Sequence, residues 1–129
     1  MKLNIIIPLI CLFAVILTAV ATTDDAWTAP ARASAKKNPV AADATSIGRG
    51  KVVYTAECAT CHGVSGKGDG PQAKDLEKNP GNLTNLQGQS AGALFWKVSE
   101  GKKPMPTMSS KLTEQQRWDV VNYIQTLGK

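Results

Sequence analysis

The chain has 129 residues, 43% of them hydrophobic, and a formal net charge of +5, which is enough material for one folded domain. A mild positive charge without a dense basic run interleaved with aromatic residues argues against nucleic acid as a partner. It is compatible with partners that have acidic surfaces. Three cysteines are too few for a scaffold held together by several disulfides.

The N-terminus has the pattern of a secretory signal peptide. A short positive start, Met1-Lys2, precedes an almost wholly apolar run from Leu3 to Val20, and Ala19-Val20-Ala21 fits the small-x-small cleavage rule. We therefore predict a signal peptide over residues 1–21, whose removal with Lys2 lowers the formal charge to +4. The alternative is that residues 3–20 stay as a membrane anchor, because about 20 apolar residues span a bilayer.

Either alternative implies export of the remaining chain, and we expect it in the bacterial periplasm, free or tethered to the inner membrane by residues 3–20. Residues 22–45 are rich in Ala, Thr, Asp and Pro and show no apolar periodicity, so we expect a flexible linker there. Trp27 is the one large apolar residue in it, and we expect it to be exposed or loosely packed. The folded domain is then residues 46–129.

The domain should be all-α, because three helices are indicated and no stretch has convincing strand character. The first starts at an N-cap, Thr45 or Ser46, and runs up to His62. The second runs from about Ser90 to Glu100 and ends before Gly101. The third opens with a capping box formed by Thr113 and Gln116 and stops at Gly128.

Residues 58 to 62 read Cys58-Ala59-Thr60-Cys61-His62, which is the attachment signature of a c-type haem. Positions i, i+3 and i+4 share one face of a helix, so both thiols and one imidazole can reach a single flat macrocycle. We predict that Cys58 and Cys61 bind one haem c covalently and that His62 is an axial iron ligand.

Between the first two helices lies a long glycine-rich loop, Gly63 to Gln89. Loops of this length in small domains are usually functional or disordered. The three helices alone enclose little apolar volume, and domains of this size are marginal without help. A large flat cofactor wrapped by the loop would explain both features.

His62 is the only histidine, so a second histidine ligand from this chain is impossible, as is a Cys2His2 zinc site. The other axial ligand, if there is one, should be a methionine. Met105 sits in Lys103-Pro104-Met105-Pro106, where two prolines restrict the backbone and reduce the ordering cost of binding. Met108 has no such frame and is the second choice. Both methionines could instead only fill gaps in the core.

Residues 46–129 resemble a small monohaem class I cytochrome c of the bacterial type. The matching residues are Gly50 to Tyr54, Cys58-x-x-Cys61-His62-Gly63, Gly66-x-Gly68-Asp69-Gly70-Pro71, Gly101-x-x-Pro104-Met105-Pro106 and Trp118-x-Val120-Val121-x-Tyr123-Ile124. The resemblance covers about two thirds of the chain, in the family's order. It implies N- and C-terminal helices that cross, with a middle helix and long loops around one haem.

The resemblance also implies roles for three supporting residues. Gly50 of the first helix would lie against Tyr123 of the last where the two cross. The carbonyl of Pro71 would accept a hydrogen bond from the second ring nitrogen of His62 and so orient the axial ligand.

The expected function is one-electron transfer by an Fe(II)/Fe(III) carrier with His/Met ligation, not an enzyme. The expected partners are redox proteins, with docking steered by Lys67, Lys97, Lys102, Lys103 and Lys111 if these flank the haem edge. We expect a monomer that contacts a membrane only if the N-terminal segment is uncleaved.

Three alternatives remain at this point. One is a haem domain with labile or absent methionine ligation, acting as a peroxidase or gas sensor. Another is a cytochrome subunit of a larger oxidoreductase. The third is a thiol–disulfide protein, which needs a low-pKa thiol at a helix N-terminus. The cysteine pair here falls at the end of a predicted helix instead.

Overall fold

The computed structural model describes residues 27–86 and 88–129, so the predicted signal peptide or anchor and the start of the predicted linker lie outside the described residues. The helices are α1 (Ala31–Ser34), α2 (Ala44–Glu57), α3 (Ala59–His62), α4 (Ala91–Glu100) and α5 (Glu114–Ile124), with a 3-10 turn η1 (Ala73–Asp75). The described part contains no strand beyond an isolated bridge between Lys102 and Met105, which confirms the all-α fold. Within these two stretches no helix is long and apolar enough to cross a membrane.

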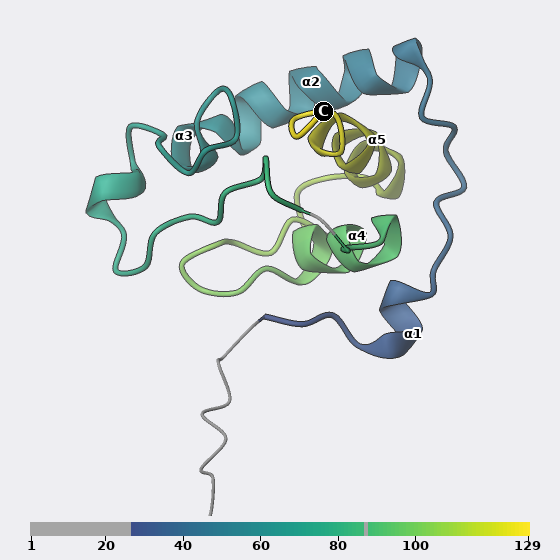
Figure 1. The fold of residues 1–129 in the computed structure, drawn as a ribbon, viewed down its shortest axis with the longest axis horizontal. Coiled ribbons are helices and arrows are strands. Elements are labelled where there is room, and N and C mark those ends of the chain that lie inside the picture. Colours follow the sequence, from purple (N-terminus) through teal and green to yellow (C-terminus); the bar gives the residue numbers. More distant parts are fainter. Residues whose placement is uncertain (1–26, 87) are drawn as a thin grey trace, which may run out of the picture.

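Helices α2 and α5 share the most extensive helix–helix contact, and α5 passes across α2 on its inner side (Figure 1). A glycine permits this approach: a Cβ on Gly50 would lie 2.0 Å from the carbonyl oxygen of Asp119 and 2.9 Å from Cβ of Tyr123. Next to the contact, the rings of Tyr54 and Tyr123 pack with centroids 5.1 Å apart. The two residues named by resemblance, Gly50 and Tyr123, are therefore neighbours.

Helix α2 begins earlier than the sequence suggested. Its N-cap is Asp43, whose side chain accepts a hydrogen bond from the backbone nitrogen of Ser46 at 2.8 Å, so the expected cap at Thr45 or Ser46 is wrong. Ser46 is instead buried one turn into the helix, where its hydroxyl donates to Oδ1 of Asp119 at 2.6 Å. A serine that signals a cap in the sequence thus serves as a contact between helices.

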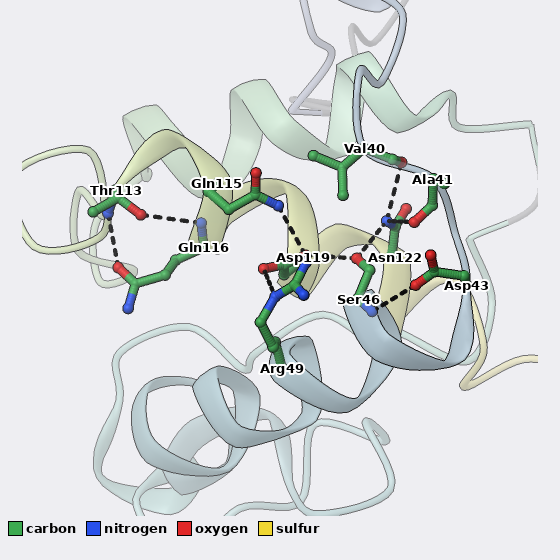
Figure 2. A network of polar contacts seen from close by, with 10 residues as sticks. All are labelled: Val40, Ala41, Asp43, Ser46, Arg49, Thr113, Gln115, Gln116, Asp119 and Asn122. Atoms are coloured by element: carbon green, nitrogen blue, oxygen red, sulfur yellow. Dashed lines mark hydrogen bonds and ion pairs between the residues drawn. The ribbon is translucent and has the colours of Figure 1, made fainter.

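Asp119 and Asn122 of α5 are the centre of a polar network that joins three parts of the chain (Figure 2). Arg49 donates to both carboxylate oxygens of Asp119 at 2.8 Å, and Gln115 adds a third side-chain donor at 3.2 Å. Asn122 donates to Ser46 at 2.9 Å and to the carbonyls of residues 40 and 41 at 3.3 Å. A buried carboxylate is tolerated here because its oxygens are paired and hydrogen-bonded.

Residues 27–45, which fall within the predicted linker, pack against the domain instead of extending freely. Helix α1 lies against α4, and the chain then runs along one side of the molecule to α2 (Figure 1). Lys36 pairs with Glu114 at 3.1 Å, and Asn38 donates to Asn122 at 2.7 Å. Polar contacts are joined by scattered apolar ones at Trp27, Ala29 and Val40, which have no helical or strand period, so hydrophobic periodicity could not reveal the packing.

The core under α4 is aromatic. The rings of Phe95 and Trp118 stack with centroids 3.9 Å apart, and the ammonium of Lys36 lies 4.5 Å from the Phe95 centroid. The ends of α4 and the start of α5 agree with the sequence: Ser90 caps α4, Gly101 follows it at φ 67°, and the Thr113–Gln116 capping box is present. Helix α5 ends at Ile124, and turns carry the chain on toward Gly128.

Replacing Gly50 with alanine should force α2 and α5 apart, because the added Cβ would overlap the backbone of Asp119. We expect a loss of about 1–3 kcal/mol in the free energy of unfolding, measured by denaturant titration. The matched control is Gly48→Ala in the same helix, where a Cβ meets nothing within 4 Å. The control should be neutral or stabilising by about 0.5–1 kcal/mol, and equal losses in both variants would contradict the crossing contact.

Replacing Asp119 with asparagine should remove a pH-dependent part of the stability. Burial raises the pKa of Asp119, but the hydrogen bonds from Arg49, Ser46 and Gln115 outweigh it and hold the pKa below its usual value. The contribution is therefore full above about pH 4 and is lost as pH falls through the lowered folded-state pKa.

We expect Asp119→Asn to cost about 2 kcal/mol at pH 7 and clearly less at pH 3, measured by urea unfolding. Asp75→Asn, on an exposed side chain of η1, is the control and should keep the wild-type stability at pH 7. A cost for Asp119→Asn that is the same at both pH values would show that its charge does not stabilise the fold.

Candidate functional site

The Cys58–His62 motif lies where one helix ends and the next begins, not within one continuous helix. Cys58 has φ −117° and ψ −38°; it follows α2 and precedes the single turn of α3. Its carbonyl accepts hydrogen bonds from the backbone nitrogens of Cys61 at 3.2 Å and His62 at 2.9 Å. The expectation of an unbroken helix is therefore wrong, but the turn that brings the three side chains to one side is present.

These three side chains border one cavity of about 400 Å³, a volume in the range of small-molecule and cofactor sites. Its wall is mostly apolar. The residues of the wall come from the motif, the second half of the Gly63–Gln89 loop, α4 and the segment that follows α4. The residues that line the cavity include Trp27, Cys58, Cys61, His62, Lys78, Gly81, Leu83, Leu86, Gln89, Leu94, Lys97, Val98, Lys102, Lys103, Met105 and Met108.

The two thiols are free, as covalent attachment of a cofactor requires. Burial, and then the charges of Glu57 and Cys61, raise the pKa of the Cys58 thiol to about 12. A thiol–disulfide protein needs the opposite, a cysteine whose pKa is lowered so that the thiolate forms near neutral pH. The surroundings of Cys58 therefore do not suit thiol–disulfide exchange.

His62 is held by a different carbonyl from the one expected. Its Nδ1 lies 3.1 Å from the carbonyl oxygen of Gly81, whereas Pro71 is exposed, so the role assigned to Pro71 is wrong. Burial lowers the pKa of His62, and the contact with Gly81 opposes this effect only in part. Because a carbonyl only accepts, Nδ1 carries the proton in this contact, which leaves Nε2 as the nitrogen through which the ring can bind a metal.

The long loop folds back onto the motif in its first half. The backbone nitrogens of Gly68 and Gly70 donate to the carbonyls of His62 and Cys61 at 2.8 and 3.0 Å. Gly70 must be a glycine, because a Cβ there would lie 2.3 Å from the carbonyl oxygen of Thr60. The second half, from Leu76 to Leu86, contributes to the cavity wall, as expected for a loop that wraps a cofactor.

Both candidate methionines border the cavity, so the structure brings each of them to the same site as His62. Met105 is partly buried, and its backbone nitrogen donates to the carbonyl of Lys102 at 2.9 Å. Met108 is buried, with 4% of its surface exposed, and its backbone nitrogen donates to the carbonyl of Val98 at 3.3 Å.

Sequence reasoning missed two residues of the site, Gly81 and Trp27. Gly81 sits in the run Asn79-Pro80-Gly81-Asn82, whose Pro-Gly pair marks a turn and could have drawn attention to it. Trp27 is partly buried and packs on Trp96 with ring centroids 6.2 Å apart, although it lies far from the motif in the sequence. Lys97 was considered for steering at the haem edge together with four other lysines, and it lines the cavity.

An all-helical fold with two free thiols, a histidine oriented by a carbonyl and two methionines around one apolar cavity has the features of a haem-binding class of protein. A family model described as "Cytochrome c" matches residues 47–128. The chain belongs to the cytochrome c family, whose members carry covalently bound haem c and transfer electrons. The cavity residues fit that group.

Similar proteins agree with this assignment. The chain is 31% identical over 118 residues to cytochrome c6 of Nostoc sp., covering 92% of each chain. It is 32% identical over 80 residues to cytochrome c6 of the alga Alaria esculenta, covering 62% of this chain and 90% of that one.

A solved structure shares the fold: a reducing HAO-like protein complex of Kuenenia stuttgartiensis, with a TM-score of 0.65 and 29% identity over 70% of this chain. The chain spans 47% of the length of the chain it matches there.

Replacing Cys58 and Cys61 together with alanine should abolish covalent haem attachment, because no other thiol borders the cavity among the described residues. Intact mass and haem staining of a denaturing gel measure this directly. Thr60→Ala, between the two cysteines, is the control and should keep the haem. Covalent haem in the double variant would contradict the site.

Proposed function

We propose that this chain is a one-electron carrier that cycles one covalently bound haem between Fe(II) and Fe(III), with His62 and Met105 as axial ligands. The observation that carries the proposal is the single cavity bordered by Cys58, Cys61, His62 and both candidate methionines. The haem supplies the one-electron chemistry when bound. The cysteine pair at 58 and 61 and the lone histidine allow one such group.

Met105 is favoured over Met108 because of the segment that carries it. The backbone bridge between Lys102 and Met105, together with Pro104 and Pro106, fixes the chain so that little order is lost on binding. Met108 already has a structural role, since its buried side chain packs in the core cluster and its carbonyl accepts from Leu112 at 2.8 Å. Met108 stays the second choice for the distal ligand.

With a nitrogen and a sulfur ligand both bound, no open position is left for a substrate. The protein then acts by holding the haem and by setting the polarity around it. Gly81 orients His62, and the buried side chains of Leu94, Val98 and Met108 exclude water from the cavity. A Met/His pair raises the reduction potential relative to a histidine alone. The function is therefore electron transfer rather than catalysis at the iron.

We place the protein in the bacterial periplasm, as a monomer that is free or held at the inner membrane by residues 3–20. The proposed partners are redox proteins with acidic docking surfaces. Of the lysines considered for steering, Lys97, Lys102 and Lys103 line the cavity, while Lys67 and Lys111 do not. We therefore expect Lys102 and Lys103 to contribute most to the electrostatic steering of a redox partner.

The second candidate is a cytochrome subunit or domain of a larger oxidoreductase. The observation in its favour is the match to part of a longer chain in the reducing HAO-like complex. In that case the electron route is the same, but the partner is permanent. A peroxidase or gas sensor would need labile or absent methionine ligation, which the spectrum of the oxidised protein distinguishes.

The axial ligand is tested by replacing each methionine with alanine in the haem-loaded protein. We expect the oxidised wild type to show a sulfur-to-iron charge-transfer band that is lost in Met105→Ala and kept in Met108→Ala. Met108→Ala should instead lower the free energy of unfolding by about 2–5 kcal/mol, because a buried side chain is removed. A five-coordinate high-spin wild type would support the sensor or peroxidase alternative.

Steering is tested by replacing Lys102 and Lys103 with glutamate and measuring the rate of reduction by an acidic redox partner against ionic strength. We expect a lower rate at low salt and a flatter dependence on salt, because opposite charges accelerate encounter only when they are poorly screened. Replacing Lys51 and Lys74 with glutamate is the control, because both lysines are exposed and neither lines the cavity. An unchanged rate and slope would remove Lys102 and Lys103 from docking.

A further inference from the structure

Lys97 of α4 is a cation in the cavity wall whose contacts among residues 27–86 and 88–129 are with neutral groups. Its ammonium donates to Oε1 of Gln89 at 2.6 Å and lies 5.5 Å from the ring centroid of Trp27. Among the described residues no carboxylate lies within ion-pair distance of it; the pairs formed there join Lys36 to Glu114, Arg49 to Asp119 and Lys111 to Glu57.

A partly buried ammonium without an acidic partner is unfavourable. Burial lowers the pKa of Lys97, because water is withdrawn from its ammonium. An anion placed beside it in the cavity would supply that charge. Lys78, Lys102 and Lys103 also line the cavity. Lys78 and Lys103 are exposed to water, and Lys102 already has an interaction partner.

Trp27 covers Lys97 from the side of the N-terminal segment. It precedes the region that matches the cytochrome c family model, which begins at residue 47. The segment that carries it runs beneath α4 toward α1 (Figure 1), and its ring packs on Trp96. Trp27, Gln89 and Lys97 border both the haem cavity and a second cavity of about 410 Å³, so they form the partition between the two.

We propose that Lys97 supplies an internal positive charge that pairs with a carboxylate side chain of the haem, and that Trp27 shields this pair from water. The inference rests on the proposed function, in that the haem must occupy this cavity. Haem carries its carboxylates along one edge. Among the lysines that line the cavity, Lys97 is the one whose partly buried ammonium a carboxylate would stabilise. Lys97 and Trp27 thus act on the haem as positioning and charge-setting residues.

The pair has a consequence for the redox equilibrium. A positive charge close to the haem favours the reduced iron, which carries one positive charge fewer than the oxidised iron. Trp27 strengthens the effect because an ion pair removed from water is screened less by solvent and salt.

The test is the midpoint potential of the haem-loaded protein in wild type and in three variants, K97Q, K97R and K103Q. We expect K97Q to shift the reduction equilibrium about tenfold toward the oxidised form, which is 59 mV for a one-electron couple. K97R should restore most of the wild-type value, and K103Q should shift the equilibrium less than about twofold, because exposed charges are screened. Equal shifts in K97Q and K103Q, or no rescue by K97R, would overturn the role of Lys97.

Trp27 is tested with W27A alone and combined with K97Q. We expect W27A to shift the equilibrium in the same direction as K97Q, to make the contribution of Lys97 sensitive to salt, and to add little in the K97Q background. Additive shifts would overturn the shielding role. The optical test of the methionine ligand is separate, so a failure of the proposed axial pair shows in the wild-type spectrum and not in this comparison.

Discussion

The close approach of α2 and α5 at Gly50 is the contact on which the rest of the structure depends. Without a side chain at this position, the backbone of Asp119 comes within reach of α2, and Ser46 and Arg49 of α2 then bind the Asp119 carboxylate. The crossing fixes the C-terminal end of α2, where Cys58 begins the haem motif. A small residue far from the cavity therefore sets the position of the covalent attachment site.

The site itself combines rigid and adaptable parts. The turn from Cys58 to His62 is held by its own backbone hydrogen bonds and by the returning glycine loop. The methionine segment is held by prolines and a backbone bridge, and the N-terminal segment closes the wall with Trp27. Covalent bonds, one oriented imidazole and an apolar wall are together the features by which a protein tunes a haem for electron transfer.

The sequence was sufficient to predict features that depend on residues close together in the chain. The haem motif, the Ser90 cap, the Gly101 terminus and the Thr113–Gln116 capping box depend on neighbouring residues, and all are present. The sequence was not sufficient to predict contacts between residues that are far apart in the chain. The contact of Ser46 with Asp119 spans 73 positions, so the sequence did not show it. Residues 27–45 looked free because polar contacts and a few scattered apolar ones, such as Trp27 on Trp96, hold them. The carbonyl that orients His62 comes from Gly81 in an irregular loop, where no periodicity constrains the path.

The central claim is that Met105 and His62 hold the iron between them, and proton NMR of the reduced, haem-loaded protein tests it most directly. A methionine bound over the face of an aromatic macrocycle has its methyl resonance shifted far upfield by the ring current. The account predicts one such methyl resonance, which disappears on replacing Met105. A spectrum without an upfield methyl, or one whose upfield methyl belongs to Met108, would contradict it.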